Sequence, residues 1–224
     1  QDSGPVSGCT GGFLSWGESP NLLGRSRLTA NTQEMLMALV ALTTFAVLRA
    51  PIGDPQVQGF FDRLPGTFGA ADRYEGFVAR SHRDPVTLKH SWGDPVMPRF
   101  HDPARHAGVV FTLSLWRSLE SVNAFAYSGV HGEAMRRRLD WFVRPEWPSY
   151  AVWWVGDDHV PDWREASSRL ELLHDRGPTP EAFNFGTAFG PDQAPLRIDR
   201  DAVREIVGRA SSVQQDGAAL ELER

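Results

Sequence analysis

Residues 109–142 read VVFTLSLWRSLESVNAFAYSGVHGEAMRRRLDWF, and their pattern is the strongest indication of the fold. Its first eight residues are mostly valine, leucine and aromatic side chains, a composition typical of a β-strand. Ser118 then offers a helix N-cap, and Glu120 places a negative charge in the first helical turn, where the helix dipole favours it. The stretch therefore predicts a strand followed by a helix that runs to about residue 138 or 142 and bends near Gly129.

Three further strands are predicted outside this stretch. Residues 39–48 are rich in valine, threonine and phenylalanine, and Pro51 ends the run. Residues 74–80 and 150–155 (YAVWWV) give the second and fourth strands in chain order. The strand at 109–116 is thus the third of four.

Two more helices separate or follow these strands. Residues 55–64 carry apolar side chains at helical spacing until Pro65 and Gly66 interrupt them. Asp162 and Glu165 are three residues apart, which is the spacing of a capping box, and they begin a helix that reaches about residue 174.

The order of elements predicts an α+β fold of the ferredoxin-like βαββαβ plan, followed by a helix. Four strands with helices on one face leave the other face of the sheet uncovered. Two copies packed face to face would bury that apolar face, so we expect a homodimer of the dimeric α/β-barrel type.

The chain is organised around one central domain. Residues 1–33 are rich in glycine, serine and proline and are predicted to be a flexible N-terminal extension. The ferredoxin-like domain spans 34–190, and its long loop at 81–107 is expected to act as a lid or pocket wall. Residues 191–224 are a C-terminal helix, predicted over 199–210, and a polar tail.

Composition narrows the classes of partner. The net charge is -5 and no basic block is longer than Arg136–Arg138, which argues against nucleic acid as the partner. Cys9 is the single cysteine, so an internal disulfide is excluded and a cytoplasmic location is expected. The apolar run 35–48 is shorter than the roughly 20 residues of a spanning helix, so no membrane partner is expected.

The helix after residue 116 carries the predicted catalytic residues. Tyr127, His131, Met135, Arg138 and Phe142 recur at three- and four-residue steps and would share one helical face. The histidine has three interpretations: a general base, a haem ligand, or a buried imidazole hydrogen-bonded to a backbone carbonyl. As a base it would be assisted by Tyr127 and Arg138, which would stabilise an enolate or phenolate.

Aromatic residues are abundant and predict the walls of a pocket. The chain has eight tryptophans, and large aromatic clusters line sites for flat apolar ligands. Trp116, Phe111, Trp141 and Trp153, together with Met135, are expected to bind a small hydrophobic metabolite.

Several other sites are not supported by the sequence. There is no G-x-G-x-x-G or G-x-x-x-x-G-K loop for a nucleotide and no G-x-S-x-G elbow of a serine hydrolase. Asp157, Asp158 and His159 are interpreted as a polar loop that leads into the capping box, because adjacent residues alone rarely bind a metal. No metal site is predicted.

Short motifs resemble a known family. SLWRS at 114–118, AFAY at 124–127 and His131 resemble the S-x-W-x-S…A-F-x-Y…H helix of the antibiotic-biosynthesis-monooxygenase-like superfamily. Further motifs, over roughly residues 39–185, resemble one uncharacterised bacterial and fungal family within that superfamily: Arg49–Pro51, Asp54-Pro55, Arg136–Arg138, Trp141-Phe142, Trp153–Val155, His159, Pro161 and Gly177–Phe183.

The resemblance implies a dimeric α/β barrel and a range of activities. The superfamily includes cofactor-free oxygenases of aromatic polyketides, haem-degrading enzymes, isomerases and decarboxylases. We therefore expect a cofactor-independent tailoring enzyme in secondary metabolism, either an oxygenase or an acid/base-assisted cyclase or isomerase. The alternatives are a haem-binding enzyme with His131 as the ligand and a non-catalytic small-molecule binding protein.

Overall fold

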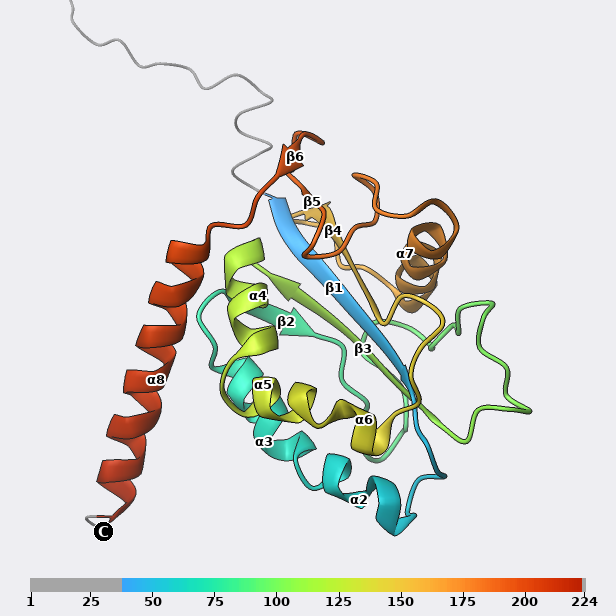
Figure 1. Cartoon of the computed structure of the whole chain (residues 1–224), viewed down its shortest axis with the longest axis horizontal. Helices are drawn as coiled ribbons and strands as arrows, with labels where there is room; N and C mark the ends of the chain where they lie inside the picture. Colours follow the sequence, from blue (N-terminus) through green and yellow to red (C-terminus); the bar gives the residue numbers. More distant parts are fainter. Residues whose placement is uncertain (1–37, 223–224) are drawn as a thin grey trace, which may run out of the picture.

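The computed structural model describes residues 38–222, which contain a four-stranded antiparallel sheet (Figure 1). The strand order is β2-β3-β1-β4, and helices connect β1 to β2 and β3 to β4. This is the predicted ferredoxin-like α+β arrangement, which is confirmed. The sheet of the described residues is open and forms no closed barrel. The strands are β1 (Ala38–Val47), β2 (Phe77–Arg80), β3 (Val109–Trp116) and β4 (Tyr150–Gly156).

One face of the sheet, here the first face, packs against the helices that connect the strands. Val40, Leu42, Trp116 and Val152 point to this face, because side chains alternate between the two sides of a strand. They are covered by α3 (Leu64–Asp72), which contributes Ala71, and by α4 (Leu119–Tyr127), which contributes Leu119, Val122 and Phe125.

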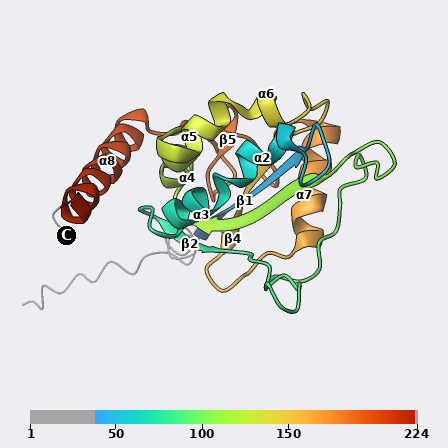
Figure 2. The same cartoon turned by 90° about the horizontal axis from the view of Figure 1, so that it is seen from below.

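The opposite face, here the second face, is also covered by residues of the same chain. It carries Ala41, Phe45, Leu113 and Trp153, all buried. Helix α7 (Trp163–Arg176) packs on it through Trp163, Ala166 and Leu170, and the 81–107 loop adds Trp92, Met97 and Phe100. Figure 2 shows the sheet between α4 and α5 on one side and α7 on the other.

The covered second face removes the reason given for a homodimer. That prediction assumed that all helices lie on one side, whereas the helix beginning at Trp163 crosses to the other side. The face that a barrel-type partner would bury is therefore already occupied by residues of the same chain. A homodimer stays a prediction, and it would need a different surface.

The long helix predicted after Trp116 is three helices: α4, α5 (Gly129–Arg136) and α6 (Arg138–Trp141). Ser128 is extended, with φ -123° and ψ 172°, and its hydroxyl donates to the Ala124 carbonyl at 2.7 Å. Gly129 follows with φ 52°, so the predicted bend is a complete break. As a result, the five residues from Tyr127 to Phe142 do not share one helical face.

Two helix ends also differ from prediction. Helix α2 (Pro55–Phe61) is followed directly by α3, in which Pro65 occupies the first turn instead of ending a helix. Proline suits that position because its missing N–H would be unbonded there in any case. Helix α8 (Arg200–Leu222) continues beyond the predicted end at residue 210, since alanine, glutamine, leucine and glutamate favour helix in that stretch.

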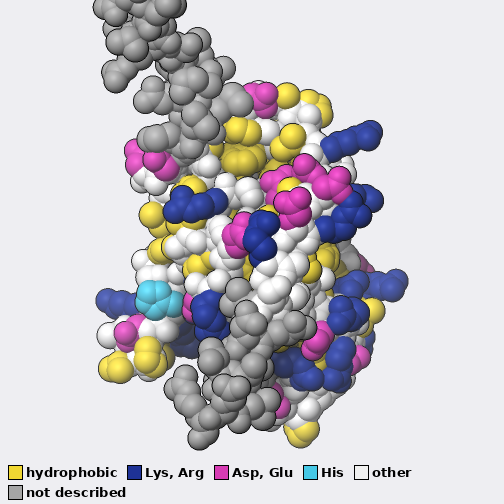
Figure 3. Space-filling view, turned by 90° about the vertical axis from the view of Figure 1, so that its left-hand side faces the viewer, with side chains coloured by type: hydrophobic (Ala, Val, Ile, Leu, Met, Phe, Trp, Pro, Cys, Tyr) yellow, Lys and Arg dark blue, Asp and Glu magenta, His cyan; other side chains and the backbone are white. Residues whose placement is uncertain are grey.

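Helix α8 packs on α4, and the Arg209 guanidinium pairs with both carboxylate oxygens of Glu75 at 2.8 and 2.9 Å. Figure 3 looks at this side of the molecule, where acidic and basic side chains are interspersed. A short two-stranded ribbon, β5 (Ala188–Phe189) and β6 (Pro195–Leu196), precedes α8 in the chain. Within residues 38–222, no helix is long and apolar enough to cross a membrane. The predicted extension at 1–33 lies outside the described residues.

Candidate functional site

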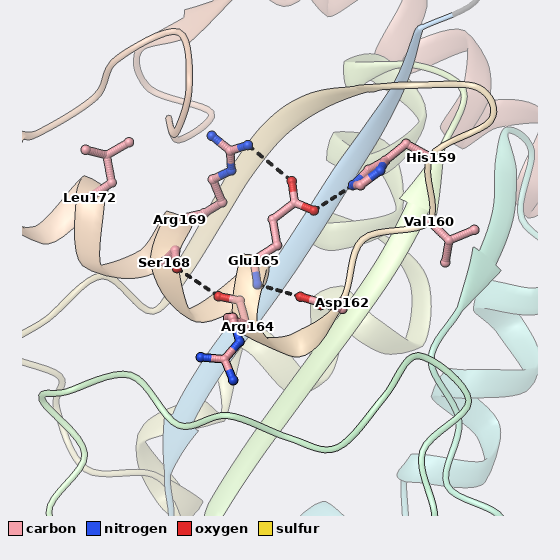
Figure 4. A pocket seen from close by; sticks show the side chains of 8 residues that line it. All are labelled: His159, Val160, Asp162, Arg164, Glu165, Ser168, Arg169 and Leu172. Carbon is pink, nitrogen blue, oxygen red and sulfur yellow. Dashed lines mark hydrogen bonds and ion pairs between the residues drawn. The ribbon is translucent and has the colours of Figure 1, made fainter.

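A surface pocket of about 420 Å³ lies at the beginning of α7. A volume of this size is within the range of small-molecule sites. Six of the eight lining side chains are polar or charged, and the other two, Val160 and Leu172, are apolar (Figure 4). The pocket is lined by His159, Val160, Asp162, Arg164, Glu165, Ser168, Arg169 and Leu172.

The local sequence positions the residues of this pocket. Asp162 is the N-cap of α7, and its carboxylate accepts the backbone N–H of Glu165 at 2.7 Å, as the capping-box spacing predicted. In a complete capping box, the glutamate side chain would turn back to the N-cap backbone. Glu165 instead points to three other side chains, which frees it for a role in the pocket.

The Glu165 carboxylate is the centre of a hydrogen-bond network. One oxygen accepts from Trp153 Nε1 at 2.9 Å and from Arg169 Nη2 at 3.1 Å. The other oxygen lies 2.7 Å from Nε2 of His159 (Figure 4). Because an ionised carboxylate can only accept, Nε2 carries the hydrogen. In the neutral form of the half-exposed His159, the nitrogen without a hydrogen is then Nδ1.

Arg169 places a positive charge next to this pair. Its Nη1 donates to the Glu181 carbonyl at 3.0 Å, and its guanidinium lies 5.8 Å from the centre of the Trp153 ring. A guanidinium has five N–H donors, and the hydrogen bonds to Glu181 and Glu165 use two of them. The remaining donors can stabilise a negative charge that develops on a bound molecule.

The predicted base His131 occupies a different environment. Its Nδ1 lies 2.8 Å from the Ala126 carbonyl and its ring lies 4.8 Å from the Phe125 ring. Burial lowers the pKa of His131 more than this hydrogen bond raises it. The geometry matches the third interpretation of the sequence, in which a buried imidazole binds a backbone carbonyl.

The predicted partners of His131 are not brought to it. Tyr127 is half-exposed and lies against the Phe185 ring at 6.0 Å. Burial raises the pKa of the Tyr150 phenol, and Tyr127 raises it further. Arg138 is exposed and its Nη1 donates to the Met135 carbonyl at 2.9 Å. The break at Ser128 explains this separation.

The predicted aromatic pocket is likewise divided. Trp116 lies on the first face of the sheet, whereas Phe111 and Trp153 lie on the second face. Trp141 packs against α2, with its ring 6.0 Å from that of Phe60. These four side chains therefore do not line one cavity. Trp153 is connected to the α7 pocket only by its hydrogen bond to Glu165, which lines that pocket.

The sequence carried a partial signal for the network that it did not identify. Glu165 and Arg169 are four residues apart on a helix, which places them side by side, and the capping box marks where that helix begins. Trp153 joins them only because β4 runs beneath α7. No group of three His, Cys, Asp or Glu able to hold a metal is found among residues 38–222.

The buried His131 predicts a pH dependence of stability. Its pKa is lowered in the folded state, so the unfolded chain binds the proton more readily. Stability should therefore fall as the pH drops from about 6.5, the unfolded value, towards the folded pKa. We expect His131→Phe to lose less stability than the wild type between pH 7.5 and pH 5 in urea unfolding. The exposed His82, changed to Phe, serves as control and should follow the wild type. Equal losses for His131→Phe and wild type would contradict this assignment.

Comparisons with known proteins give a family and no activity. The family model described as "Domain of unknown function (DUF3291)" matches residues 39–199. No curated protein matches the chain.

Three similar solved structures are distant in sequence. A protein of unknown function, NE2512 from Nitrosomonas europaea, is 12% identical, with 56% of this chain and 95% of that chain covered and a TM-score of 0.33. A conserved protein from Methanosarcina mazei Go1 is 10% identical, with coverages of 55% and 97% and a TM-score of 0.34. PA3566 from Pseudomonas aeruginosa is 8% identical, with coverages of 56% and 98% and a TM-score of 0.34.

The predicted membership of the antibiotic-biosynthesis-monooxygenase-like superfamily is wrong. The motifs that suggested it, such as SLWRS at 114–118, lie within the region that the DUF3291 model matches, and that model is described as a domain of unknown function. The chain belongs to the DUF3291 family, whose model spans well over half of it.

Proposed function

We propose that this protein is a cofactor-independent acid–base enzyme, of the isomerase or cyclase type, that acts on a small, partly apolar molecule. The observation that carries the proposal is the 2.7 Å contact between Glu165 and His159 at a pocket of about 420 Å³. A base that is oriented by a carboxylate is the arrangement by which enzymes activate an imidazole. The predicted class of reaction is kept, while the base moves from His131 to His159.

The chemistry follows from the three polar residues. His159 Nδ1 takes a proton from a carbon next to a carbonyl group of the substrate, which leaves an enolate. Arg169 stabilises the negative charge on the enolate oxygen, and Glu165 stabilises the imidazolium. The imidazolium returns the proton to a different carbon, so that the product is an isomer of the substrate. Val160 and Leu172 offer contacts to the apolar part of the molecule.

The proposal is tested by hydrogen exchange at carbon, which detects proton abstraction before the natural substrate is known. We would incubate the protein in D₂O with phenylpyruvate and with α-tetralone, and follow the loss of the C–H signal by NMR. The wild type should accelerate exchange of at least one compound. General-base catalysis typically contributes about 10²- to 10⁴-fold, so His159→Gln should lose at least about 100-fold of the acceleration.

Two further variants make the result specific. Glu165→Gln should also lose most of the acceleration, because the imidazole is then no longer oriented. His174→Gln, at an exposed histidine of the same helix, should keep it. Retained exchange in His159→Gln would overturn the proposal, and loss in His131→Gln alone would return the base to the position predicted from sequence. Wild-type protein that binds these compounds without accelerating exchange would favour a binding protein.

A further inference from the structure

Three buried polar atoms without a hydrogen-bond partner belong to residues around one buried cluster on the second face of the sheet: Ser81 Oγ, His90 Nδ1 and Trp163 Nε1. The Ser81 backbone N–H donates to the Leu113 carbonyl at 2.9 Å, which fixes this serine beside β3. The His90 ring lies edge-on to Trp163, with 5.3 Å between ring centres. An unpaired buried polar atom costs about 1–3 kcal/mol, so such atoms are uncommon and call for a partner.

The surroundings of these atoms are aromatic and apolar. Phe111 lies 4.7 Å from Trp163, and Leu113 and Leu115 belong to the same buried cluster. Trp92 packs against that cluster from the loop. Apolar and aromatic walls with a few polar atoms are the composition of small-molecule sites.

We propose that residues 82–92 cover a binding site for a flat aromatic molecule that carries a hydroxyl or carbonyl oxygen. The Trp163 N–H would donate to that oxygen, and the Ser81 hydroxyl and His90 Nδ1 would complete its hydrogen bonds. Trp163 and Phe111 are in direct contact, so the ring of the guest would lie against Trp163 in the space that the displaced Trp92 and its segment leave. Aromatic rings prefer such stacked or edge contacts.

The covering segment is built to move as a unit. The Asp84 N–H donates to the Lys89 carbonyl and the Ser91 N–H to the His82 carbonyl, each at 2.9 Å. Within residues 38–222, every hydrogen bond of residues 82–91 joins two residues of that same segment. Its displacement therefore breaks no hydrogen bond to the sheet or to α7.

A neighbouring hollow gives a route to the site. A surface pocket of about 440 Å³ lies between this segment and β2, and its lining includes Phe77, Ala79, Ser91 and Trp92. Trp92 thus contacts both the open pocket and the buried cluster. The rest of the loop is fastened to α7, because the Arg99 N–H donates to Glu171 at 2.7 Å and Ser167 donates to the Val96 carbonyl. Rotation of Trp92 with its segment would join the two spaces.

This site shares no lining residue with the α7 pocket, so it can be tested independently of the proposed function. The probe is 2-naphthol, a flat aromatic molecule with one hydroxyl, and binding is measured by isothermal titration calorimetry. Saturable binding at one site per chain is expected for the wild type. His90→Phe and Trp163→Phe keep an aromatic ring and remove the polar atom, and each should weaken binding about tenfold, which corresponds to about 1.4 kcal/mol.

Ser81→Ala is a milder third variant in case the aromatic exchanges disturb folding. Ser81→Ala removes only an unpaired buried atom, so it should not lower the melting temperature of the free protein, whereas loss of a structural hydrogen bond would lower it. Trp163→Phe also removes part of a buried ring, so its melting temperature is compared with that of a second tryptophan-to-phenylalanine variant. Trp147→Phe is the matched control: its Nε1 is also buried and unpaired, but it lies beside Phe100, away from Trp163. Absent wild-type binding, unchanged binding in His90→Phe and Trp163→Phe, or binding lost only in His159→Gln would each overturn the proposal.

Discussion

Gly76→Ala is expected to destabilise the fold by about 2–5 kcal/mol. Gly76 has φ 82°, a left-handed conformation that costs an L-residue about 1–2 kcal/mol. A Cβ at this position would also collide with the Ser121 side chain, whose own Cβ would lie only 2.6 Å away. Ser121 is buried and cannot move aside, so overpacking adds about 1–3 kcal/mol.

The measurement is urea unfolding of Gly76→Ala beside a control that isolates the collision. Gly53 has φ 95°, but a Cβ there would meet no atom within 4 Å. Gly53→Ala should therefore lose only the conformational part, about 1–2 kcal/mol. Equal losses for the two variants would show that α4 gives way at Ser121 without cost.

Trp116→Ala is expected to lower the free energy of unfolding by about 3–5 kcal/mol, the range for removal of a large buried side chain. The Trp116 side chain is 1% exposed, and its ring lies 5.2 Å from Phe125 and 5.3 Å from Phe77. Its Nε1 donates to Ser114 Oγ at 2.9 Å, so the variant also leaves that hydroxyl without its donor.

The same exchange at a partly buried tryptophan serves as control. Trp92→Ala should cost clearly less, because that ring lies at the edge of the second-face cluster. The comparison also separates a core residue from a pocket residue, since Trp116 was predicted to bind the metabolite. A small stability loss in Trp116→Ala, together with weaker binding of a ligand, would support the predicted role of Trp116 in the pocket.

The sheet could be predicted from sequence because each strand carries its own signal. The run from Val109 to Trp116 combines β-favouring residues with a clear N-cap at Ser118, and the structure places the strand at those residues. Local composition and turn residues are enough to order four strands and the helices between them. Strand order then follows from the small number of topologies that such an order allows.

Other features depended on contacts that no local pattern contains. Helix α7 was predicted from its capping box, but the box says nothing about which face of the sheet the helix covers. The break at Ser128 depends on one hydroxyl that bonds a carbonyl four residues earlier, which competes with the helix at that position. Sequence periodicity alone therefore placed Tyr127 and His131 on one helix.

The candidate site was only half visible for the same reason. The spacing of Glu165 and Arg169 can be read from the chain, but the Trp153 indole that fixes Glu165 comes from a strand under the helix. His159 was interpreted as part of a polar loop, and its contact with Glu165 forms only because the loop returns to the first turn of α7. Hydrogen bonds between separate elements, not residue types, assemble this site.

The central position of β1 has a consequence for synthesis of the chain. Ala38 pairs with Gly156 and Val40 with Trp116, so β1 is made well before either of its partner strands. At translation rates of about 5–20 residues per second, the roughly 110 residues from the end of β1 to the end of β4 take about 5–20 s. Until β3 has been made, an apolar strand of ten residues has both edges unpaired, and one edge stays unpaired until β4 follows, a state that favours aggregation. The nascent chain is thus expected to be most prone to aggregation in the seconds before β4 has been made.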